Sequence, residues 1–278
     1  TFRVKVEGMQ QESPMTPSNL AAIFSLIVIF IGAIYVAASP GAVMAAETGP
    51  QMVSPKVDPA AKPLKMVQAE SASKSTASRV GTRADHLVIL FHGIRGRGAV
   101  MEALGNSWQA TLPDTVFVAP DAPFAHKSGG RQWFAVDDQI MRPERIDAAR
   151  RAFDRVVSEI VKREGFEGAL DRVAFVGVSQ GAIMALDGVA SGRWKVGALV
   201  TFAGLLPLPP TSSSTRTDIL MMHGAEDKTI PPAATTVASG QLRSAGFTVT
   251  SKIYPGVGHT ISSEEAKDAV IFLRDGFK

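Results

Sequence analysis

The 278-residue sequence contains no cysteine, and this absence removes several classes of chemistry. A chain without thiols has no disulfide framework, no thiolate metal site and no cysteine nucleophile. The histidines do not replace them as metal ligands, because His86, His92 and His126 show no metal-ligand spacing. The sequence therefore predicts no metal and no cofactor.

An excess of one charge sign is also missing from most of the chain. Residues 1–83 hold 8 Lys+Arg and 5 Asp+Glu, so residues 84–278 hold 21 of each, and the formal net charge of +3 comes entirely from the N-terminal part. The main part of the chain thus has no general electrostatic reason to bind nucleic acid. We expect no nucleic-acid partner.

The N-terminal part contains one long apolar run, Leu20 to Ala38, within a segment that is free of charge from Ser13 to Ala46. As a helix, these 19 residues would span about 28 Å, which is close to the thickness of a bilayer's hydrocarbon core. Because the run is long for a signal peptide and is preceded by as many acidic as basic residues, a retained membrane anchor is one interpretation.

The residues after the run favour a cleavable export signal instead. Ser39-Pro40-Gly41 would break a helix, and Ala42 to Ala46 are mostly small residues that suit a cleavage site. A third interpretation is a helix packed on the main domain. The sequence begins at Thr1, and Met9 and Met15 are candidate starts, so a mis-set start would instead leave a cytoplasmic protein.

Three regions are therefore expected along the chain. Residues 1–46 are an export signal or membrane anchor, which would make the protein exported (periplasmic or secreted) or membrane-anchored. Residues 47–83 are rich in Pro, Ala, Ser, Thr and Lys without helical or strand periodicity, as in a flexible linker. Residues 84–278 form the main domain.

From Asp85 onward, short apolar segments alternate with amphipathic ones, which is typical of βαβ units on a mostly parallel sheet with helices on both faces. The expected strands are 86–91, 115–119, 172–178, 196–203, 218–223 and 248–254, and the expected helices are 99–111, 142–164, 181–191, 232–245 and 262–277. Only residues 204–217 separate two of these strands, which is too short for a lid domain. The predicted fold class is α/β.

The motif Gly177-Val178-Ser179-Gln180-Gly181 lies between an expected strand and an expected helix. This GxSxG pattern is the nucleophile elbow, in which a sharp strand-to-helix turn exposes a serine hydroxyl. The two glycines leave room for the crossing chain. Ser179 is therefore the candidate nucleophile.

A serine hydroxyl needs a base, and the base needs an orienting carboxylate. His223 and His259 are the histidines after Ser179. His259 follows a strand and a glycine-rich turn, so it is the candidate base, whereas His223 ends a strand and is expected to pack or hydrogen-bond locally. Asp227 is the candidate carboxylate, with Glu226 as the neighbour to exclude.

Two backbone N–H groups are needed to stabilise the oxyanion of a tetrahedral intermediate. Gln180 would supply one from the start of the helix, and Ile94 the other, from the glycine-rich loop 92–98 after the first strand. A phosphate-binding loop is a weaker alternative, because the loop lacks both the GxGxxG and the GxxxxGK spacing.

Taken together, residues Leu87 to Phe277 resemble the phospholipase/carboxylesterase family of α/β-hydrolases, which includes bacterial carboxylesterases and acyl-protein thioesterases. The segments that carry the resemblance are 90–93 (LFHG), 119–123 (APDAP), 132–134 (QWF), 177–182 (GVSQGA), 203–207 (AGLLP), 223–227 (HGAED) and 258–259 (GH). Residues 1–83 have no counterpart in the core of this family.

The resemblance implies an α/β-hydrolase fold with Ser179, Asp227 and His259 as the triad and Ile94 and Gln180 as oxyanion donors. It also implies that Trp133 and Phe134 border the acyl site, although a buried aromatic pair that supports the loop is the alternative. Arg95 and Arg97 stand where the family has mostly uncharged or acidic residues. Together with Arg131 they either bring positive charge to the mouth of the site or are ordinary surface arginines.

We therefore expect a serine carboxylesterase that hydrolyses short-to-medium acyl esters, small-molecule substrates, through an acyl-enzyme. A lysophospholipase or acyl-thioesterase is the enzymatic alternative, and a catalytically silent membrane-anchored binding module is the alternative of another class. Membrane association would depend on Leu20 to Ala38. The sequence leaves the oligomeric state open.

Overall fold

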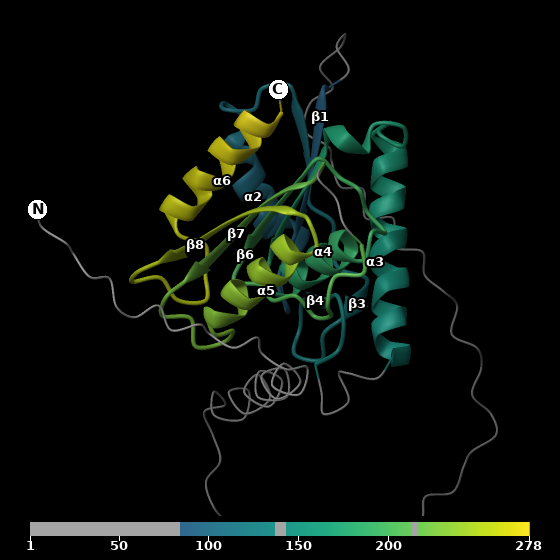
Figure 1. Cartoon of the computed structure of the whole chain (residues 1–278). Coiled ribbons are helices and arrows are strands. Elements are labelled where there is room, and N and C mark those ends of the chain that lie inside the picture. Colours follow the sequence, from purple (N-terminus) through teal and green to yellow (C-terminus); the bar gives the residue numbers. More distant parts are fainter. Residues whose placement is uncertain (1–83, 137–142, 213–215, 278) are drawn as a thin grey trace, which may run out of the picture. The chain divides into compact units, whose positions relative to one another are not determined.

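Six parallel strands form the central sheet, in the order β2-β1-β5-β6-β7-β8 (Figure 1). This computed structural model describes residues 84–136, 143–212 and 216–277, so the predictions for residues 1–83 lie outside it. The strands are β1 His86–Phe91, β2 Thr115–Val118, β5 Val173–Val178, β6 Ala198–Phe202, β7 Asp218–Gly224 and β8 Thr248–Tyr254. Within the described residues, no helix is both long enough and apolar enough to span a membrane.

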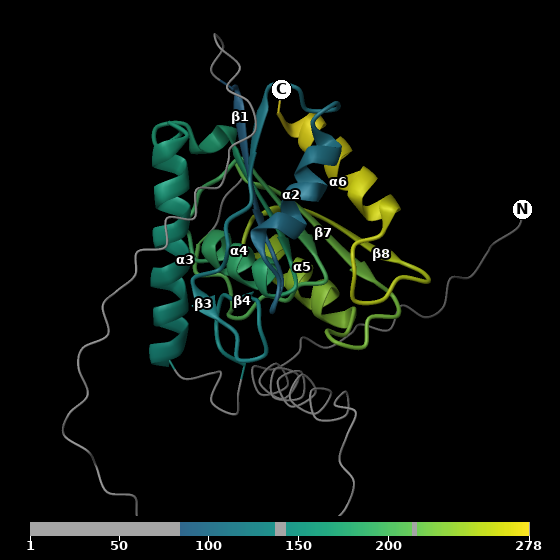
Figure 2. The same cartoon turned by 180° about the vertical axis from the view of Figure 1, so that it is seen from behind.

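In the described part of the chain, five α-helices cover the two faces of the sheet, as Figures 1 and 2 show from opposite sides. They are α2 Gly98–Trp108, α3 Pro143–Arg163, α4 Gln180–Ala190, α5 Ala233–Ser244 and α6 Ser263–Gly276, and a 3-10 turn, η1 Leu170–Arg172, precedes β5. Helices α2 and α6 lie on one face, and α3, α4 and α5 lie on the other. The predicted parallel sheet with helices on both faces is confirmed, and every expected strand and helix is present.

Alternate residues of the strands fill two separate cores. Leu87, Ile89 and Phe91 of β1 point into the cluster beneath α3, α4 and α5, whereas Val88 and Leu90 point into the cluster beneath α2 and α6. All five are completely buried, which explains why β1 is a continuous apolar run and not an alternating pattern.

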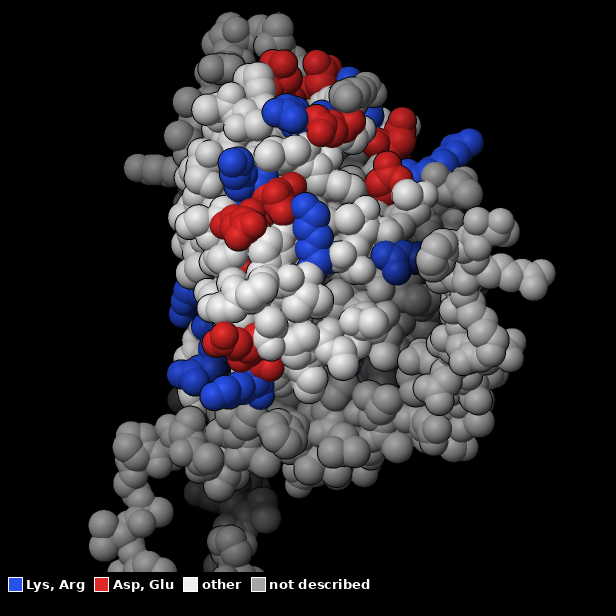
Figure 3. Space-filling view, turned by 60° about the vertical axis from the view of Figure 1, so that its left-hand side comes forward, with Lys and Arg blue, Asp and Glu red and all other residues white. Residues whose placement is uncertain are grey.

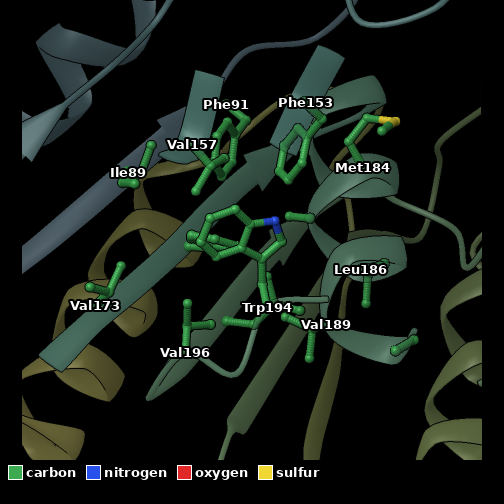
Figure 4. Close-up of a cluster of buried hydrophobic side chains, with 14 of the residues drawn as sticks. Ile89, Phe91, Phe153, Val157, Val173, Met184, Leu186, Val189, Trp194 and Val196 are labelled. Carbon is green, nitrogen blue, oxygen red and sulfur yellow. The ribbon is translucent and has the colours of Figure 1, made fainter. Parts of the chain in front are cut away.

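The larger cluster is rich in aromatic rings (Figure 4). The ring centroids of Phe91 and Phe153 are 4.9 Å apart, and Trp194 lies 5.9 Å from Phe175 in an edge arrangement. Such rings bury a large apolar area per residue. They join α3 and the turn after α4 to the middle of the sheet.

A short antiparallel hairpin, β3 Phe124–Ala125 and β4 Arg131–Gln132, was not expected from the sequence. Its two-residue strands are too short to give a periodic pattern. The hairpin is joined to the loop after β1, because Gly96 forms an isolated bridge with Arg131. The hairpin is thereby attached to the loop that follows β1.

Charged side chains of both signs lie next to one another on the face drawn in Figure 3. Among the described residues, Lys252 Nζ lies 2.8 Å from Asp268 Oδ2, and Arg274 lies 3.0 Å from Asp275. Mixed charge of this kind produces no strong field of one sign.

The strand order decides where a site can form. Strand β1 has β2 on one side and β5 on the other, so the chain leaves β1 and β5 in opposite directions along the sheet. In open α/β sheets, a crevice forms at the carboxyl ends of the strands at such a switch point. The loop after β1 and the GxSxG turn after β5 meet there.

Candidate active site

Ser179 occupies the sharp turn between β5 and α4, with φ 53° and ψ −118°. Such backbone angles are strained for a residue with a side chain and persist only where the surroundings enforce them. A Cβ on Gly177 would lie 2.6 Å from the backbone N of Ala182, and one on Gly181 would lie 2.2 Å from the carbonyl O of Phe91. Both glycines are therefore required by close backbone contacts.

The structure brings Ser179, His259 and Asp227 together in a continuous line of hydrogen bonds. Ser179 Oγ is 3.0 Å from His259 Nε2, and His259 Nδ1 is 2.7 Å from Asp227 Oδ2. The Asp227 side chain is completely buried, whereas the His259 side chain is 25% exposed. The hydroxyl thus faces a base that solvent or a substrate can reach.

Asp227 is held as a carboxylate by four donors. Its Oδ1 accepts from the backbone N–H groups of Thr229 (2.7 Å) and Ile230 (3.0 Å), and its Oδ2 is bonded by His259 and by His223 (3.0 Å). Burial alone would raise the pKa of Asp227, but the hydrogen bonds from His223, His259 and Ile230 outweigh it and hold this pKa well below its ordinary value. Glu226, by contrast, is exposed.

The loops that carry Asp227 and His259 are joined by backbone contacts. The Ala225 N–H donates to the Tyr254 carbonyl (2.8 Å), and the Glu226 N–H donates to the Val257 carbonyl (2.9 Å). Gly224 makes this approach possible, because a Cβ there would lie 2.2 Å from the Val257 carbonyl O. The positions of acid and base are thus set by the adjacent ends of β7 and β8.

The glycine-rich loop after β1 lies directly against the serine. A Cβ on Gly93 would be 3.2 Å from Ser179 Cβ and 3.8 Å from Ser179 Oγ. Arg95 has φ 63°, and its N–H donates to the Arg131 carbonyl at 2.8 Å, while the Arg131 N–H donates to the Gly96 carbonyl at 3.0 Å. The loop therefore owes its shape to the β3–β4 hairpin.

The two expected oxyanion donors, Gln180 and Ile94, belong to the two segments that meet at Ser179. Gln180 begins α4, where the first amide hydrogens of a helix have no intrahelical acceptor. Ile94 directly follows Gly93, the residue that lies against Ser179. Two backbone N–H groups in these positions could bind an oxygen that develops negative charge.

His92 supports this loop as a neutral ring. Its Nε2 accepts the Ala122 N–H at 2.9 Å, so the hydrogen resides on Nδ1, which donates to the Gly93 carbonyl at 2.7 Å. Burial lowers the pKa of His92, and this favours the neutral ring further. Because this histidine bonds to the backbone on both sides, it fixes the start of the loop.

The Gln180 side chain has a function that the sequence did not reveal. Its Oε1 accepts the Trp133 N–H at 3.0 Å, and its Nε2 donates to the Phe134 carbonyl at 2.9 Å. A glutamine directly after the serine thus clamps the 133–134 segment. The pairing of an amide side chain with one distant backbone segment leaves no local pattern in the sequence.

Trp133 does not lie where a substrate could touch it, contrary to the expectation that both aromatic residues border an acyl site. Its side chain is completely buried, its ring packs on Phe91 and Phe153, and its Nε1–H donates to the His92 carbonyl at 2.9 Å. An indole with a satisfied N–H fits this role in a core. Trp133 therefore supports the loop after β1.

Phe134 lines a cavity of about 330 Å³ between the β3–β4 hairpin, α3 and α4. The other lining residues are Phe124, Gln132, Ala135, Arg145, Ile146, Ala148, Ala149, Arg150, Ile183, Met184, Asp187 and Pro207. The cavity begins one helical turn from the serine, because the Ile183 N–H donates to the Ser179 carbonyl. Phe134 and Ile183 also pack against Ile230, near Asp227.

The three arginines near the loop differ in their surroundings. Arg131 donates through Nε to the Ala122 carbonyl (2.7 Å) and through a terminal nitrogen to the Pro123 carbonyl (2.8 Å), so it holds the backbone before the hairpin. Arg97 is largely exposed, and one of its terminal nitrogens is 3.8 Å from Asp121 Oδ2. Arg131 therefore has a structural role, which differs from both of the roles expected from the sequence.

Comparisons with known proteins agree with this geometry. The family model described as Phospholipase/Carboxylesterase matches residues 75–275. Esterase YpfH of Escherichia coli (strain K12) is 34% identical over 196 residues, which cover 69% of this chain and 83% of that protein. Acyl-protein thioesterase 1 of Gibberella zeae is 26% identical over 211 residues, 67% of this chain and 88% of that protein.

Solved structures give the same result. The crystal structure of esterase PE8 superposes with a TM-score of 0.63 at 30% sequence identity, and the match covers 69% of this chain and 93% of that one. The strand order, the GxSxG turn and the family match all indicate the same fold and family. The chain belongs to the phospholipase/carboxylesterase family and has the α/β-hydrolase fold.

Proposed function

We propose that this protein is a serine carboxylesterase that hydrolyses esters through an acyl-enzyme on Ser179. The observation that carries the proposal is the line of hydrogen bonds from Ser179 Oγ to His259 Nε2 (3.0 Å) and from His259 Nδ1 to Asp227 Oδ2 (2.7 Å). The names of its relatives, esterase and carboxylesterase, support the same reaction class.

In the first half-reaction, Ser179 Oγ attacks the ester carbonyl carbon while His259 Nε2 takes the hydroxyl proton. Asp227 stabilises the resulting imidazolium through Nδ1–H. The carbonyl oxygen becomes an oxyanion, to which the N–H groups of Ile94 and Gln180 donate. His259 Nε2–H then passes its proton to the departing alcohol oxygen, and the C–O bond of the ester breaks.

The second half-reaction repeats these steps with water. His259 Nε2 removes a proton from a water molecule, whose oxygen attacks the acyl carbon. The tetrahedral intermediate collapses, Ser179 Oγ leaves and recovers its proton from His259, and the acid is released. The protonation states of the triad are then those at the start.

The cavity lined by Phe134 and Ile183 supports an acyl chain as its occupant. Its walls are mostly apolar, and its volume of about 330 Å³ is at the lower end of small-molecule sites, which run from about 300 to 1,000 Å³. A chain of short-to-medium length fits such a space. Faster turnover of a long-chain triglyceride than of a butyrate ester would contradict this preference.

A thioester is the second candidate substrate, because an acyl-protein thioesterase is among the relatives. The acyl part would bind in the same cavity, and only the leaving group would differ. Hydrolysis of esters and thioesters that carry the same acyl chain would separate the two activities. A lysophospholipid would differ again through its charged head group.

Labelling with a fluorophosphonate tests the nucleophile directly. We expect the wild-type full chain to be labelled and to hydrolyse p-nitrophenyl butyrate, and Ser179→Ala to do neither. Ser158→Leu, an exposed change on α3 away from the cavity, is the matched control and should behave as wild type. Equal activity in Ser179→Ala and wild type would refute the proposal, and absence of labelling in both would favour a silent binding module.

We also propose that residues 1–46 act as an export signal or a membrane anchor, on the strength of the apolar run from Leu20 to Ala38. N-terminal sequencing of the mature protein distinguishes the two. A start near Ala46 indicates cleavage, an intact run in the membrane fraction indicates an anchor, and an intact chain in the cytoplasm contradicts both.

A further inference from the structure

His223, at the carboxyl end of β7, contacts the carboxylate of the triad in the protein interior. Its ring is completely buried. Nε2 is 3.0 Å from Asp227 Oδ2 and 2.8 Å from the carbonyl O of Ile230, and Nδ1 is 2.8 Å from Thr235 Oγ1. The proposed reaction assigns no role to this histidine.

The partners of the ring decide which nitrogen carries the hydrogen. The carboxylate of Asp227 and the carbonyl of Ile230 can only accept, so Nε2 must be the protonated nitrogen and shares its hydrogen between them. In the neutral ring, Nδ1 then accepts the hydroxyl hydrogen of Thr235. Thr235, itself completely buried on α5, thus completes the hydrogen bonding of the ring and holds its orientation.

The same carboxylate oxygen, Oδ2 of Asp227, therefore receives N–H groups from two imidazoles, His223 and His259. The other oxygen is held by the Thr229 and Ile230 N–H groups. With two donors on each oxygen, the plane of the carboxylate is fixed. Without His223, Oδ2 would keep only its bond to His259, the group that it has to position, and the remaining two bonds would act on Oδ1 alone.

We propose that His223 is a positioning residue for the esterase reaction: its Nε2–H holds Asp227 Oδ2 in line with His259 Nδ1, and the Thr235 hydroxyl, bonded to Nδ1, holds the ring in the orientation that this contact requires. This inference rests on the proposed function. The hydrogen stays on His223 throughout both half-reactions. Because the His259 imidazolium forms as the chemical step proceeds, the effect belongs to kcat and not to the binding of substrate.

Four variants of the full chain separate positioning from simple packing. His223→Leu removes the N–H donor and fills the space of the ring with an apolar side chain. His223→Gln can return an N–H near the position of Nε2. Thr235→Val removes the hydroxyl with little change in shape. Ser239→Ala is the matched control, because it removes another buried hydroxyl of α5, which donates to the Thr236 carbonyl.

Steady-state hydrolysis of p-nitrophenyl butyrate, normalised to the folded fraction from circular dichroism, is the measurement. We expect His223→Leu to lower kcat about 10- to 100-fold at an unchanged KM, since small misplacements of reacting groups have effects of that size. His223→Gln should recover most of the loss, and Ser239→Ala should retain the wild-type kcat.

A folded His223→Leu with the wild-type kcat would overturn the inference, and so would a His223→Gln that is as slow as His223→Leu. If His223→Leu does not fold, Thr235→Val decides: a kcat several-fold below that of Ser239→Ala supports the inference, and an equal kcat overturns it. Failure of the proposed function itself looks different, because Ser179→Ala would then remain active.

Discussion

Filling the cavity beside Phe134 should shorten the acyl chain that the enzyme accepts. Ala148 is an exposed residue of α3 that lines the cavity, so a larger side chain can enter the space without disturbing the core. Leucine has three more carbon atoms than alanine and takes the room of about three methylenes. At about 0.8 kcal/mol per buried methylene, Ala148→Leu costs a long acyl chain about 2.4 kcal/mol, which is about 60-fold in kcat/KM.

Hydrolysis of p-nitrophenyl acetate and p-nitrophenyl octanoate measures this effect. An acetyl group is too short to reach the filled space, so its kcat/KM should stay at the wild-type value while that of the octanoate falls. Ser158→Leu on the same helix controls for the added apolar surface. An equal loss for both esters, or no loss for either, would refute the assignment of this cavity to the acyl chain.

Three further outcomes are expected. Gly224→Ala should lower kcat at least about tenfold, because the new Cβ would lie 2.2 Å from the Val257 carbonyl O. Gly240→Ala is the control and should be fully active, because a Cβ at this position has nothing within 4 Å. Loss of activity in both variants would contradict this explanation. Asp187→Leu removes a carboxylate, 5% exposed, that is bonded to Arg150 and Arg193. Because Arg193 keeps its bond to Asp154 (2.9 Å), we expect a cost of about 3 kcal/mol in the free energy of unfolding, at the low end for a broken buried pair. Calorimetry should show a far larger fall in Tm for Asp187→Leu than for Asp275→Asn, which changes an exposed ion pair. Equal falls in Tm would contradict a stabilising role of Asp187. Burial lowers the pKa of His92 in the folded chain, so below about pH 6.5 this group binds more protons in the unfolded chain than in the folded one. Its contribution to the free energy of unfolding is therefore complete above that pH and declines below it. Urea unfolding at a series of pH values should show a weaker decline for His92→Gln than for wild type, and identical slopes would exclude His92 as the cause.

Much of the site could be predicted because its residues carry local signals. Ser179 stands in a five-residue pattern between a strand and a helix, and Asp227 and His259 each lie in the loop after an expected strand. The parallel sheet was equally accessible, since strands buried on both faces read as continuous apolar runs. These features depend on neighbours in the sequence.

The features that escaped prediction depend on contacts between distant residues. The two-residue strands of the β3–β4 hairpin pair with each other, and the hairpin is also joined to Gly96, 35 positions before Arg131. For Trp133 the sequence left two roles open, a border of the acyl site or a buried support of the loop, and its contacts with Phe91, Phe153 and the distant His92 carbonyl decide for burial. Nor does the sequence reveal that the ring of His223 meets Asp227 on one side and Thr235 on the other.

The backbone contacts between the loops of Asp227 and His259 have a consequence for motion. The N–H groups of Ala225 and Glu226 bind the carbonyls of Tyr254 and Val257, so the loops that carry Asp227 and His259 are expected to move together. Ser179 lies on a separate segment, at the end of β5. A small movement of β7 and β8 at the edge of the sheet would thus carry Asp227 and His259 together away from Ser179. The ion pair that forms during turnover would survive such a movement, and only the Oγ to Nε2 contact would open and close.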